Sequence, residues 1–323
     1  MIVIASATSR AGEMTVDSLV SVVVPVYNRG TELLAAVDSV LKQSYTSIEI
    51  VVVDDGSTID IGALVRDAFP DAPIRVVRQA NAGAGAARNR GIDEARGVYT
   101  AFLDSDDVWL PWHLENAVGL LAGKRPAEGT CAAFAPIIAD RGGDCSLVRP
   151  HRAPRAGENL STYLMCDRGF VPTSTLVLPT EFARRVRYEP IARYGDDTDF
   201  AIRLHLAGCT FVMCEQPGAL VYDQNGSERL SLSRYEIADF RWLENIKDSI
   251  PRSAYLGYRG WHVAKMVART KPWMAARMFA VAVAGRAYRP TLAVAIAAQI
   301  MLPARLYRKV SDLIISRLHV SRL

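Results

Sequence analysis

The feature that most constrains the fold is a regular alternation of apolar runs and amphipathic segments over the first hundred residues. The apolar runs are rich in β-branched residues, which is typical of strands buried on both faces of a parallel sheet, and they cover residues 19–26, 48–53, 74–78 and 99–103. Helical patterns lie between them, at residues 31–43, 61–69 and 84–95. This βαβ rhythm predicts an α/β fold with a doubly wound, mostly parallel sheet.

Acidic clusters follow two of these predicted strands where each strand ends. Asp54 and Asp55 come after the second strand, and Asp104 and Asp106 come after the fourth. Because ligands of open α/β sheets bind at the carboxyl ends of the strands, we expect both clusters at one site. Oxygen ligands of this kind suit Mg²⁺ or Mn²⁺, and carboxylates also accept hydrogen bonds from a nucleobase or ribose. The structural alternatives are a solvated acidic turn and an Asx turn.

A segment rich in glycine and alanine, residues 81–91, lies between the third predicted strand and its helix. Its small residues allow a phosphate or sugar to approach backbone N–H groups at a helix start, and Arg88 adds positive charge for a diphosphate. A dinucleotide-binding fingerprint would instead follow the first strand. Close packing of alanine and glycine is the structural alternative.

Another acidic cluster, residues 195–203, begins a predicted helix over residues 197–207. A carboxylate of Asp196 or Asp197 can act there as a general base for a hydroxyl nucleophile. The structural alternative is that one of these two residues caps the helix, while Asp199 forms an ion pair with Arg203, four residues later.

These stretches resemble the family-2 glycosyltransferases, which are inverting enzymes of GT-A fold. The matching segments are residues 20–29 (VSVVVPVYNR), 39–45 (SVLKQSY), 52–58 (VVDDGST), 87–91 (ARNRG) and 102–107 (FLDSDD), followed by 195–199 (GDDTD). Each segment is common alone, but five in register over residues 18–110 are specific. The chain departs from the family where Arg187-Tyr188-Glu189-Pro190 replaces Gly-Gly-Phe and where Tyr222-Asp223-Gln224-Asn225 replaces a stretch with a histidine.

The resemblance implies a nucleotide-diphospho-sugar donor, with UDP as the default nucleotide. It places three residues in the pocket for the base, with Asp54 beside them: Pro25, Tyr27 and Asp55. Arg88 is expected to contact the diphosphate.

The resemblance also implies a divalent cation, Mn²⁺ or Mg²⁺. Asp106 is the better candidate for holding it, and Asp104 is expected to share the metal or to bind the ribose. Asp197 matches the position of the catalytic base of the family, and Asp196 stands where many members have Glu.

Charge is divided unevenly along the chain. Residues 251–323 contain 13 Lys and Arg and one acidic residue, whereas the rest contains 25 basic and 33 acidic residues, so the net charge of +4 conceals segments of +12 and −8. Residues 304–317 have the pattern of a helix with one basic and one apolar face, which favours docking on an anionic membrane. The alternative is a helical subdomain packed on the catalytic core or on a partner chain. No segment reaches the roughly 20 apolar residues of a membrane-spanning helix.

We therefore divide the chain into an N-terminal extension (1–17), a nucleotide-sugar-binding half (18–110) and an acceptor and catalytic half (111–235) of one GT-A domain, and a basic, apolar, helical C-terminal region (236–323). Five cysteines without a CxxC pair predict free thiols. Free thiols favour a cytoplasmic enzyme, and the basic, apolar C-terminal region favours a peripheral position on the inner face of the cytoplasmic membrane. A homo-oligomer is compatible with this pattern.

The expected function is transfer of a sugar, with inversion, to a hydroxyl of a glycan or lipid-linked glycan, in bacterial-type exopolysaccharide, lipopolysaccharide or other glycan assembly. A metal-dependent nucleotidyltransferase would share the sheet and the carboxylates, but it would need a Gly-rich basic loop that residues 24–29 lack. The alternative from another class is a nucleic-acid-binding protein that uses the basic residues of segment 251–323. The many aliphatic residues of this segment suit protein packing or a lipid surface better, so we expect no nucleic-acid partner.

Overall fold

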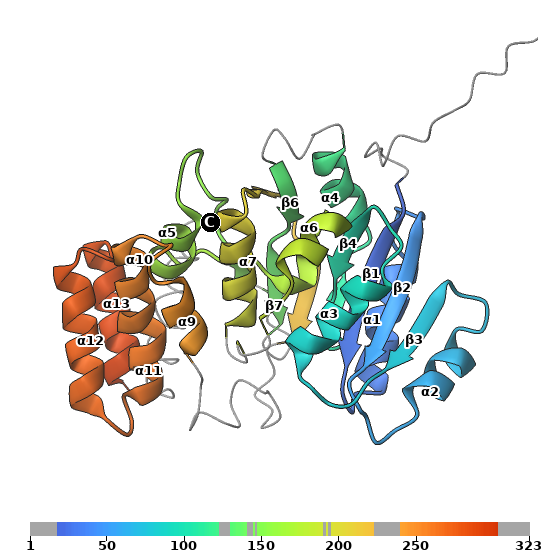
Figure 1. Cartoon of the computed structure of the whole chain (residues 1–323), viewed down its shortest axis with the longest axis horizontal. Coiled ribbons are helices and arrows are strands. Elements are labelled where there is room, and N and C mark those ends of the chain that lie inside the picture. Colours follow the sequence, from blue (N-terminus) through green and yellow to red (C-terminus); the bar gives the residue numbers. More distant parts are fainter. Residues whose placement is uncertain are drawn as a thin grey trace, which may run out of the picture. The chain divides into compact units, whose positions relative to one another are not determined.

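The computed structural model describes residues 18–122, 130–140, 145, 147–189, 192, 195–222 and 240–302. The chain divides into an α/β unit and a helical unit (Figure 1). The α/β unit comprises Met1–Pro154, Phe170–Arg234 and Ala238–Trp242, and the helical unit comprises Arg155–Gly169, Tyr235–Ile237 and Leu243–Leu323. The predicted extension over residues 1–17 lies outside the described residues.

The main sheet of the α/β unit has the strand order β10-β6-β9-β4-β1-β2-β3 in the described residues. Its strands are β1 (Val20–Val26), β2 (Ile48–Asp54), β3 (Ile74–Arg78), β4 (Tyr99–Phe102), β6 (Thr130–Phe134), β9 (Val177–Pro179) and β10 (Thr210–Met213). β1 is parallel to β2 and β4, β2 is parallel to β3, and β6 is parallel to β10, while β9 is antiparallel to β4 and β6. The predicted doubly wound, mostly parallel α/β sheet is confirmed.

Helices cover both faces of this sheet. They are α1 (Thr31–Leu41), α2 (Ile61–Ala68), α3 (Ala84–Glu94), α4 (His113–Leu121), α6 (Thr180–Val186) and α7 (Asp196–Leu206). Successive side chains of a strand point to opposite faces. Val22 and Val24 of β1 therefore pack in one cluster with Leu33 of α1, whereas Val23 faces Gly91 of α3. Burial on both faces explains why β1 is an unbroken apolar run.

A smaller sheet with the order β5-β11-β7-β8 completes the α/β unit. Its strands are β5 (Asp107–Trp109), β7 (Ile137–Asp140), β8 (Leu147–Arg149) and β11 (Ala219–Tyr222). The sequence pattern predicts a strand over 174–178, but a short 3₁₀ turn, Thr173–Thr175, precedes β9 there. The turn leaves the carbonyl of Ser174 free to accept a hydrogen bond from the Trp109 indole N–H.

The helical unit consists of short helices that approach one another closely. They are α5 (Leu160–Cys166), α10 (Arg252–Tyr258), a π-helical turn (Arg259–Val263), α11 (Ala264–Val267), α12 (Pro272–Ala284) and α13 (Pro290–Met301). A Cβ at Gly257 would lie 2.7 Å from Cys166 Sγ, and one at Gly260 would overlap Ala282 of α12. The helix α9 (Arg241–Ile246) spans the point at which the chain passes from the α/β unit to the helical unit, between Trp242 and Leu243.

The helical character predicted for the C-terminal region is confirmed in its described part, residues 241–302. The predicted basic amphipathic helix over 304–317 lies outside the described residues. Among the residues that the structure describes, none of the helices combines the length and the hydropathy required to cross a membrane.

Among the described residues, Cys209 departs from the expectation of free thiols. Cys209, next to the start of β10, is disulfide-bonded, whereas Cys145, Cys166 and Cys214 are free. The absence of a CxxC pair excludes only bonds between near neighbours in sequence, so the spacing argument fails for Cys209.

We predict that Gly91→Ala destabilises the fold whereas Gly119→Ala does not. A Cβ at Gly91 would overlap the side chain of Val23, while a Cβ at Gly119 of α4 meets no atom within 4 Å. Overpacking should lower the free energy of unfolding by about 1–3 kcal/mol, and the exposed helical site should gain up to about 1 kcal/mol. Urea unfolding measures both, and equal effects at the two sites would contradict the packing of α3 on β1.

Candidate active site

The register of the parallel strands brings the predicted site residues to one edge of the sheet. Val26 at the end of β1 pairs with Asp54 of β2, and Asp54 pairs with Arg78 of β3. On the other side of β1, the strand β4 ends at Phe102, two residues before Asp104. The two acidic clusters therefore follow strands on either side of β1, at the same edge, as the sequence pattern predicts.

The loop after β1 is bonded to the loops that carry both acidic clusters. The backbone N–H of Asn28 donates to Ser57 Oγ at 2.9 Å, and the backbone N–H of Thr58 donates to Asn28 Oδ1 at 2.7 Å. Arg29 Nη1 lies 2.6 Å from Asp106 Oδ2. Sequence reasoning missed the role of Arg29, although it belongs to the first matching segment. These contacts hold the three loops in a fixed relation.

Among the residues predicted to line the base pocket, Tyr27 is exposed to solvent. Its side chain is 47% exposed, whereas Pro25 is buried within β1. The carboxylate of Asp54 accepts from the backbone N–H of Ser57 at 2.8 Å and forms an ion pair with Arg78 at 3.0 Å. Tyr27 therefore presents a ring on which a base can stack, and Asp54 supports the loop beside it.

Asp55 is engaged with the segment that follows β3. Its Oδ1 accepts from Gln79 Nε2 at 2.8 Å and from the backbone N–H of Ala82 at 2.9 Å, and its Oδ2 accepts from the backbone N–H of Gly83 at 2.8 Å. A carboxylate has about four lone-pair sites. Asp55 thus retains about one site for a ligand while it fixes the loop before α3.

Arg88 of α3 bridges two of the predicted acidic residues. Its Nη2 lies 2.6 Å from Asp104 Oδ1 and its Nη1 lies 2.6 Å from Asp196 Oδ2, and the guanidinium carbon is 5.2 Å from the centroid of the Tyr188 ring. Burial alone would lower the pKa of Arg88, but Asp104 and Asp196 raise it well above the ordinary value. Contact with a diphosphate stays a prediction, whereas the bridge gives Arg88 a clear role in holding the site together.

The ring of Tyr188 lies against the guanidinium of this bridge. Sequence reasoning missed this residue. Its ring stacks on Phe200 at 4.0 Å and meets the edge of Phe102 at 5.4 Å. Asn89 of α3 binds the backbone of Tyr188 twice, at 2.7 and 2.8 Å. Tyr188 lies in the segment that replaces Gly-Gly-Phe. An aromatic residue is present in both segments, and this likeness could have indicated that Tyr188 belongs to the site. Pro190 of that segment lies outside the described residues, as do residues 223–225.

The acidic cluster at residues 195–203 opens the helix α7. The helix begins at Asp196 after Gly195, whose φ of +78° favours glycine, and no side chain caps it. The expectation that Asp196 or Asp197 is the cap is therefore wrong, because both lie inside the first turn. Burial, and then the charge of Asp196, raise the pKa of Asp197 to about 6. A carboxyl group with this pKa is poised to accept a proton near neutral pH.

The predicted ion pair between Asp199 and Arg203 is present at 2.7 Å. Arg203 Nη1 also donates to the carbonyl of Val186 at 2.9 Å. The ion pair gives Asp199 a structural role, and the bond from Arg203 to Val186 fixes α7 against the end of α6.

Asp104 and Asp106 fit a divalent cation that is shared with a phosphate ligand. Burial, and then the charge of Asp104, raise the pKa of Asp106, and a bound cation would relieve this repulsion. Among the described residues no group of three or more His, Cys, Asp and Glu side chains gathers to hold a metal. Two carboxylates on one loop match the usual arrangement for Mg²⁺ and related ions, which bind one or two carboxylates together with substrate phosphates.

Comparison with known proteins identifies the family. Residues 21–144 match the model described as glycosyl transferase family 2. The chain is 31% identical over 260 residues to the amylovoran biosynthesis glycosyltransferase AmsB of Erwinia amylovora, covering 76% of this chain and 83% of AmsB. The chain belongs to glycosyl transferase family 2. Several other curated relatives of this glycosyltransferase match over about a third of the chain, which covers no more than 31% of their length.

Solved structures agree on the fold of the glycosyltransferase. TarS of S. aureus, in complex with UDP-GlcNAc, superposes with a TM-score of 0.59 at 17% identity, covering 91% of this chain and 90% of TarS. The mannosyltransferase PcManGT of Pyrobaculum calidifontis, in complex with GDP-Man and Mn²⁺, gives 0.55 at 18% identity, covering 95% and 81%. The glycosyltransferase has the GT-A fold, and the nucleotidyltransferase alternative is set aside.

We predict that Arg88→Met destabilises this glycosyltransferase far more than Arg90→Met, although both residues lie on α3. Arg88 is buried between two carboxylates, and its loss leaves both without a partner. Arg90 forms one exposed i,i+4 pair with Glu94 at 2.8 Å. The expected losses in the free energy of unfolding are about 2–4 kcal/mol and about 0.5 kcal/mol. Similar losses in urea unfolding would contradict the bridge.

Proposed function

We propose that this glycosyltransferase moves a sugar from a UDP-sugar to a hydroxyl of a glycan or lipid-linked glycan, with inversion at the anomeric carbon and with the help of Mn²⁺ or Mg²⁺. Asp197 is the general base. Pro25, Tyr27 and Asp55 line the pocket for the base, and Asp54 lies beside them.

The observation that carries this proposal is the bridge from Asp104 through Arg88 to Asp196. It ties the acidic loop after β4, where a metal and diphosphate fit, to the first turn of α7. Asp197 is the next residue of that turn, and its raised pKa of about 6 suits proton abstraction. A group that binds the donor and a group that activates the acceptor therefore belong to one connected site.

In the proposed reaction, the carboxylate of Asp197 removes the proton of the acceptor hydroxyl as its oxygen attacks the anomeric carbon. The bond from that carbon to the diphosphate breaks, and the bonding electrons leave with the nucleoside diphosphate. Asp196 stays paired with Arg88 and keeps the first turn of α7 in place. A single displacement of this kind inverts the anomeric centre. Asp106 and Asp104 would hold a divalent cation, which would neutralise part of the charge of the leaving diphosphate.

The relatives support parts of this assignment. TarS binds UDP-GlcNAc and PcManGT binds GDP-Man with Mn²⁺, which supports a nucleotide-sugar donor and a divalent metal. AmsB is named for amylovoran biosynthesis, which supports a role in bacterial polysaccharide assembly. We propose that the enzyme works on the cytoplasmic side of the membrane, where nucleotide-sugar donors are available.

The direct test is nucleotide release. UDP- and GDP-sugars are screened with Mn²⁺ and a panel of glycan acceptors, and we expect release of UDP with one donor. Absence of release with every donor would indicate a binding protein that has lost activity.

With the donor so identified, we predict that Asp197→Asn lowers kcat by about 10²–10⁴-fold, the usual contribution of a general base. Binding of UDP with Mn²⁺, measured by calorimetry, should not change, because Asp197 is not among the predicted donor residues. Asp38→Asn is the matched control, since the side chain of Asp38 is 45% exposed on α1 and pairs with Lys42. Normal turnover by the Asp197 variant would refute its role as the base.

We predict that kcat/KM falls as the pH drops below about 6, because protonated Asp197 cannot accept a proton. The charge of Asp196 contributes to the raised pKa of Asp197. Asp196→Asn should therefore move the inflection to lower pH. An inflection that stays in place or moves upward would show that another group controls the profile.

A further inference from the structure

Positive charge gathers in residues 251–302 of the helical unit. Residues 251–302 contain eight Lys and Arg and no Asp or Glu. Five of the eight are exposed and form no ion pair with any other described residue: Arg252, Arg269, Lys271, Arg277 and Arg286. Unpaired cations at this density attract an anionic partner.

The same unit exposes apolar side chains along α12. Among its residues only Ala275 and Ala282 are buried. The opposite stripe, at the spacing of one helix face, is exposed and apolar apart from Arg277: Trp273, Ala276, Ala280, Val281 and Ala284. Trp273 is 67% exposed. This face of α12 therefore combines an aromatic residue, aliphatic residues and a cation.

The neighbouring helix α13 has a similar composition. It contains no charged residue over its twelve positions. Leu292 and Ile296 are buried, but Val294 and Met301 are 71% and 80% exposed. Exposed aliphatic residues on both helices need an apolar partner, not only an anionic one.

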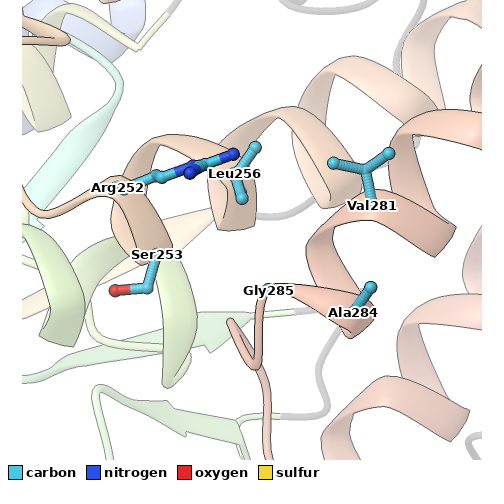
Figure 2. Close-up of a pocket in the computed structure, with 6 residues that line it drawn as sticks. All are labelled: Arg252, Ser253, Leu256, Val281, Ala284 and Gly285. Atoms are coloured by element: carbon cyan, nitrogen blue, oxygen red, sulfur yellow. The ribbon is translucent and has the colours of Figure 1, made fainter.

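A pocket of about 490 Å³ lies between α10 and α12 (Figure 2). Arg252, Ser253 and Leu256 line it from α10, and Val281, Ala284 and Gly285 line it from the other side. One wall thus offers a guanidinium and a hydroxyl group, and the rest is apolar. This combination suits a phosphate group attached to a hydrocarbon chain, as in a lipid headgroup.

We propose that the helical unit docks on an anionic lipid bilayer through the face formed by α10 and α12. The exposed cations contact lipid phosphates, and Trp273 and Val281 enter the boundary between headgroups and acyl chains. At 1.5 Å per residue, the thirteen residues of α12 extend about 20 Å, less than the roughly 30 Å of a hydrocarbon core. The helix therefore lies on the bilayer rather than across it.

Two other occupants fit the face less well. A second copy of the chain would bring the unpaired cations of both copies together, and like charges across an interface oppose association. A nucleic acid would neutralise the cations, but its phosphates would leave the aliphatic side chain of Val281 without an apolar partner. Both are outcomes that the test distinguishes.

The experiment is co-sedimentation of the full chain with vesicles of phosphatidylcholine containing 30% phosphatidylglycerol, against pure phosphatidylcholine. We expect binding to the anionic vesicles alone, weakened by salt. Arg277→Glu should reduce the partition coefficient at least about tenfold, and Trp273→Ala at least about fivefold.

The matched controls lie in the α/β unit. Arg66→Glu reverses an exposed arginine of α2, and Leu206→Ala shortens a side chain that is 43% exposed. Neither should change vesicle binding. UDP release without vesicles should be the same for Arg277→Glu and the unmodified chain, so that docking is tested apart from the proposed function.

Several results would overturn the proposal. Equal binding to both kinds of vesicle would show that anionic lipid is not recognised. Equal reductions of the partition coefficient by Arg277→Glu and Arg66→Glu would show that this face is not the docking surface. A dimer that Trp273→Ala dissociates, without vesicle binding, would assign the face to a second copy. An oligonucleotide gel shift without vesicle binding would assign it to nucleic acid.

Discussion

The double ion pair of Arg88 is the interaction on which the rest of the site depends. Its guanidinium is buried and joins Asp104, which follows β4, to Asp196, which begins α7. These carboxylates are 92 positions apart in sequence, and each would lose its closest cation without Arg88. A buried cation with two partners and the Tyr188 ring beside it permits few alternative geometries. Arg88 therefore ties the acidic loop after β4 to the first turn of α7.

The other acidic residues of the site are held by contacts of the same kind. Asp106 pairs with Arg29, Asp54 pairs with Arg78, and Asp55 accepts three hydrogen bonds from the loop before α3. A cluster of carboxylates at one edge of a sheet would otherwise repel itself. Burial and a neighbouring carboxylate raise the pKa of both Asp106 and Asp197, but Arg29 opposes the shift at Asp106. Asp197, whose pKa is raised to about 6, is the carboxyl group better suited to take a proton near neutral pH.

Local sequence was sufficient for most of the first half of the fold. The strand over residues 74–78 and the beginnings of α1, α2 and α3 coincide with the structure, because β-branched runs and apolar periodicity are local signals. The edge of the sheet at which the two acidic clusters meet follows from the parallel alternation, because the carboxyl ends of parallel strands lie at one edge. In contrast, the start of α7 was misjudged, because Gly195 enters the helix from a left-handed conformation and leaves no capping side chain.

The partners of the site residues could not be predicted, since they are distant in sequence. Arg29 meets Asp106 across 77 positions. Tyr188 reaches Arg88 from a segment that departs from the family pattern, and its stacking on Phe200 depends on how α7 packs. The motifs therefore predicted that the two acidic clusters lie at one edge of the sheet, whereas the cations and rings that hold them depend on the tertiary fold.

The central claim is that Arg88 couples Asp104 to Asp196, and a double-mutant cycle tests it most directly. The free energy of unfolding is measured for Asp104→Asn, Asp196→Asn and the double variant, in the presence of Arg88 and again in Arg88→Met. With Arg88 present, the two substitutions should be non-additive by about 0.5–3 kcal/mol, as for residues that share a partner. In Arg88→Met the coupling should disappear. Additivity within about 0.5 kcal/mol with Arg88 present would contradict the account.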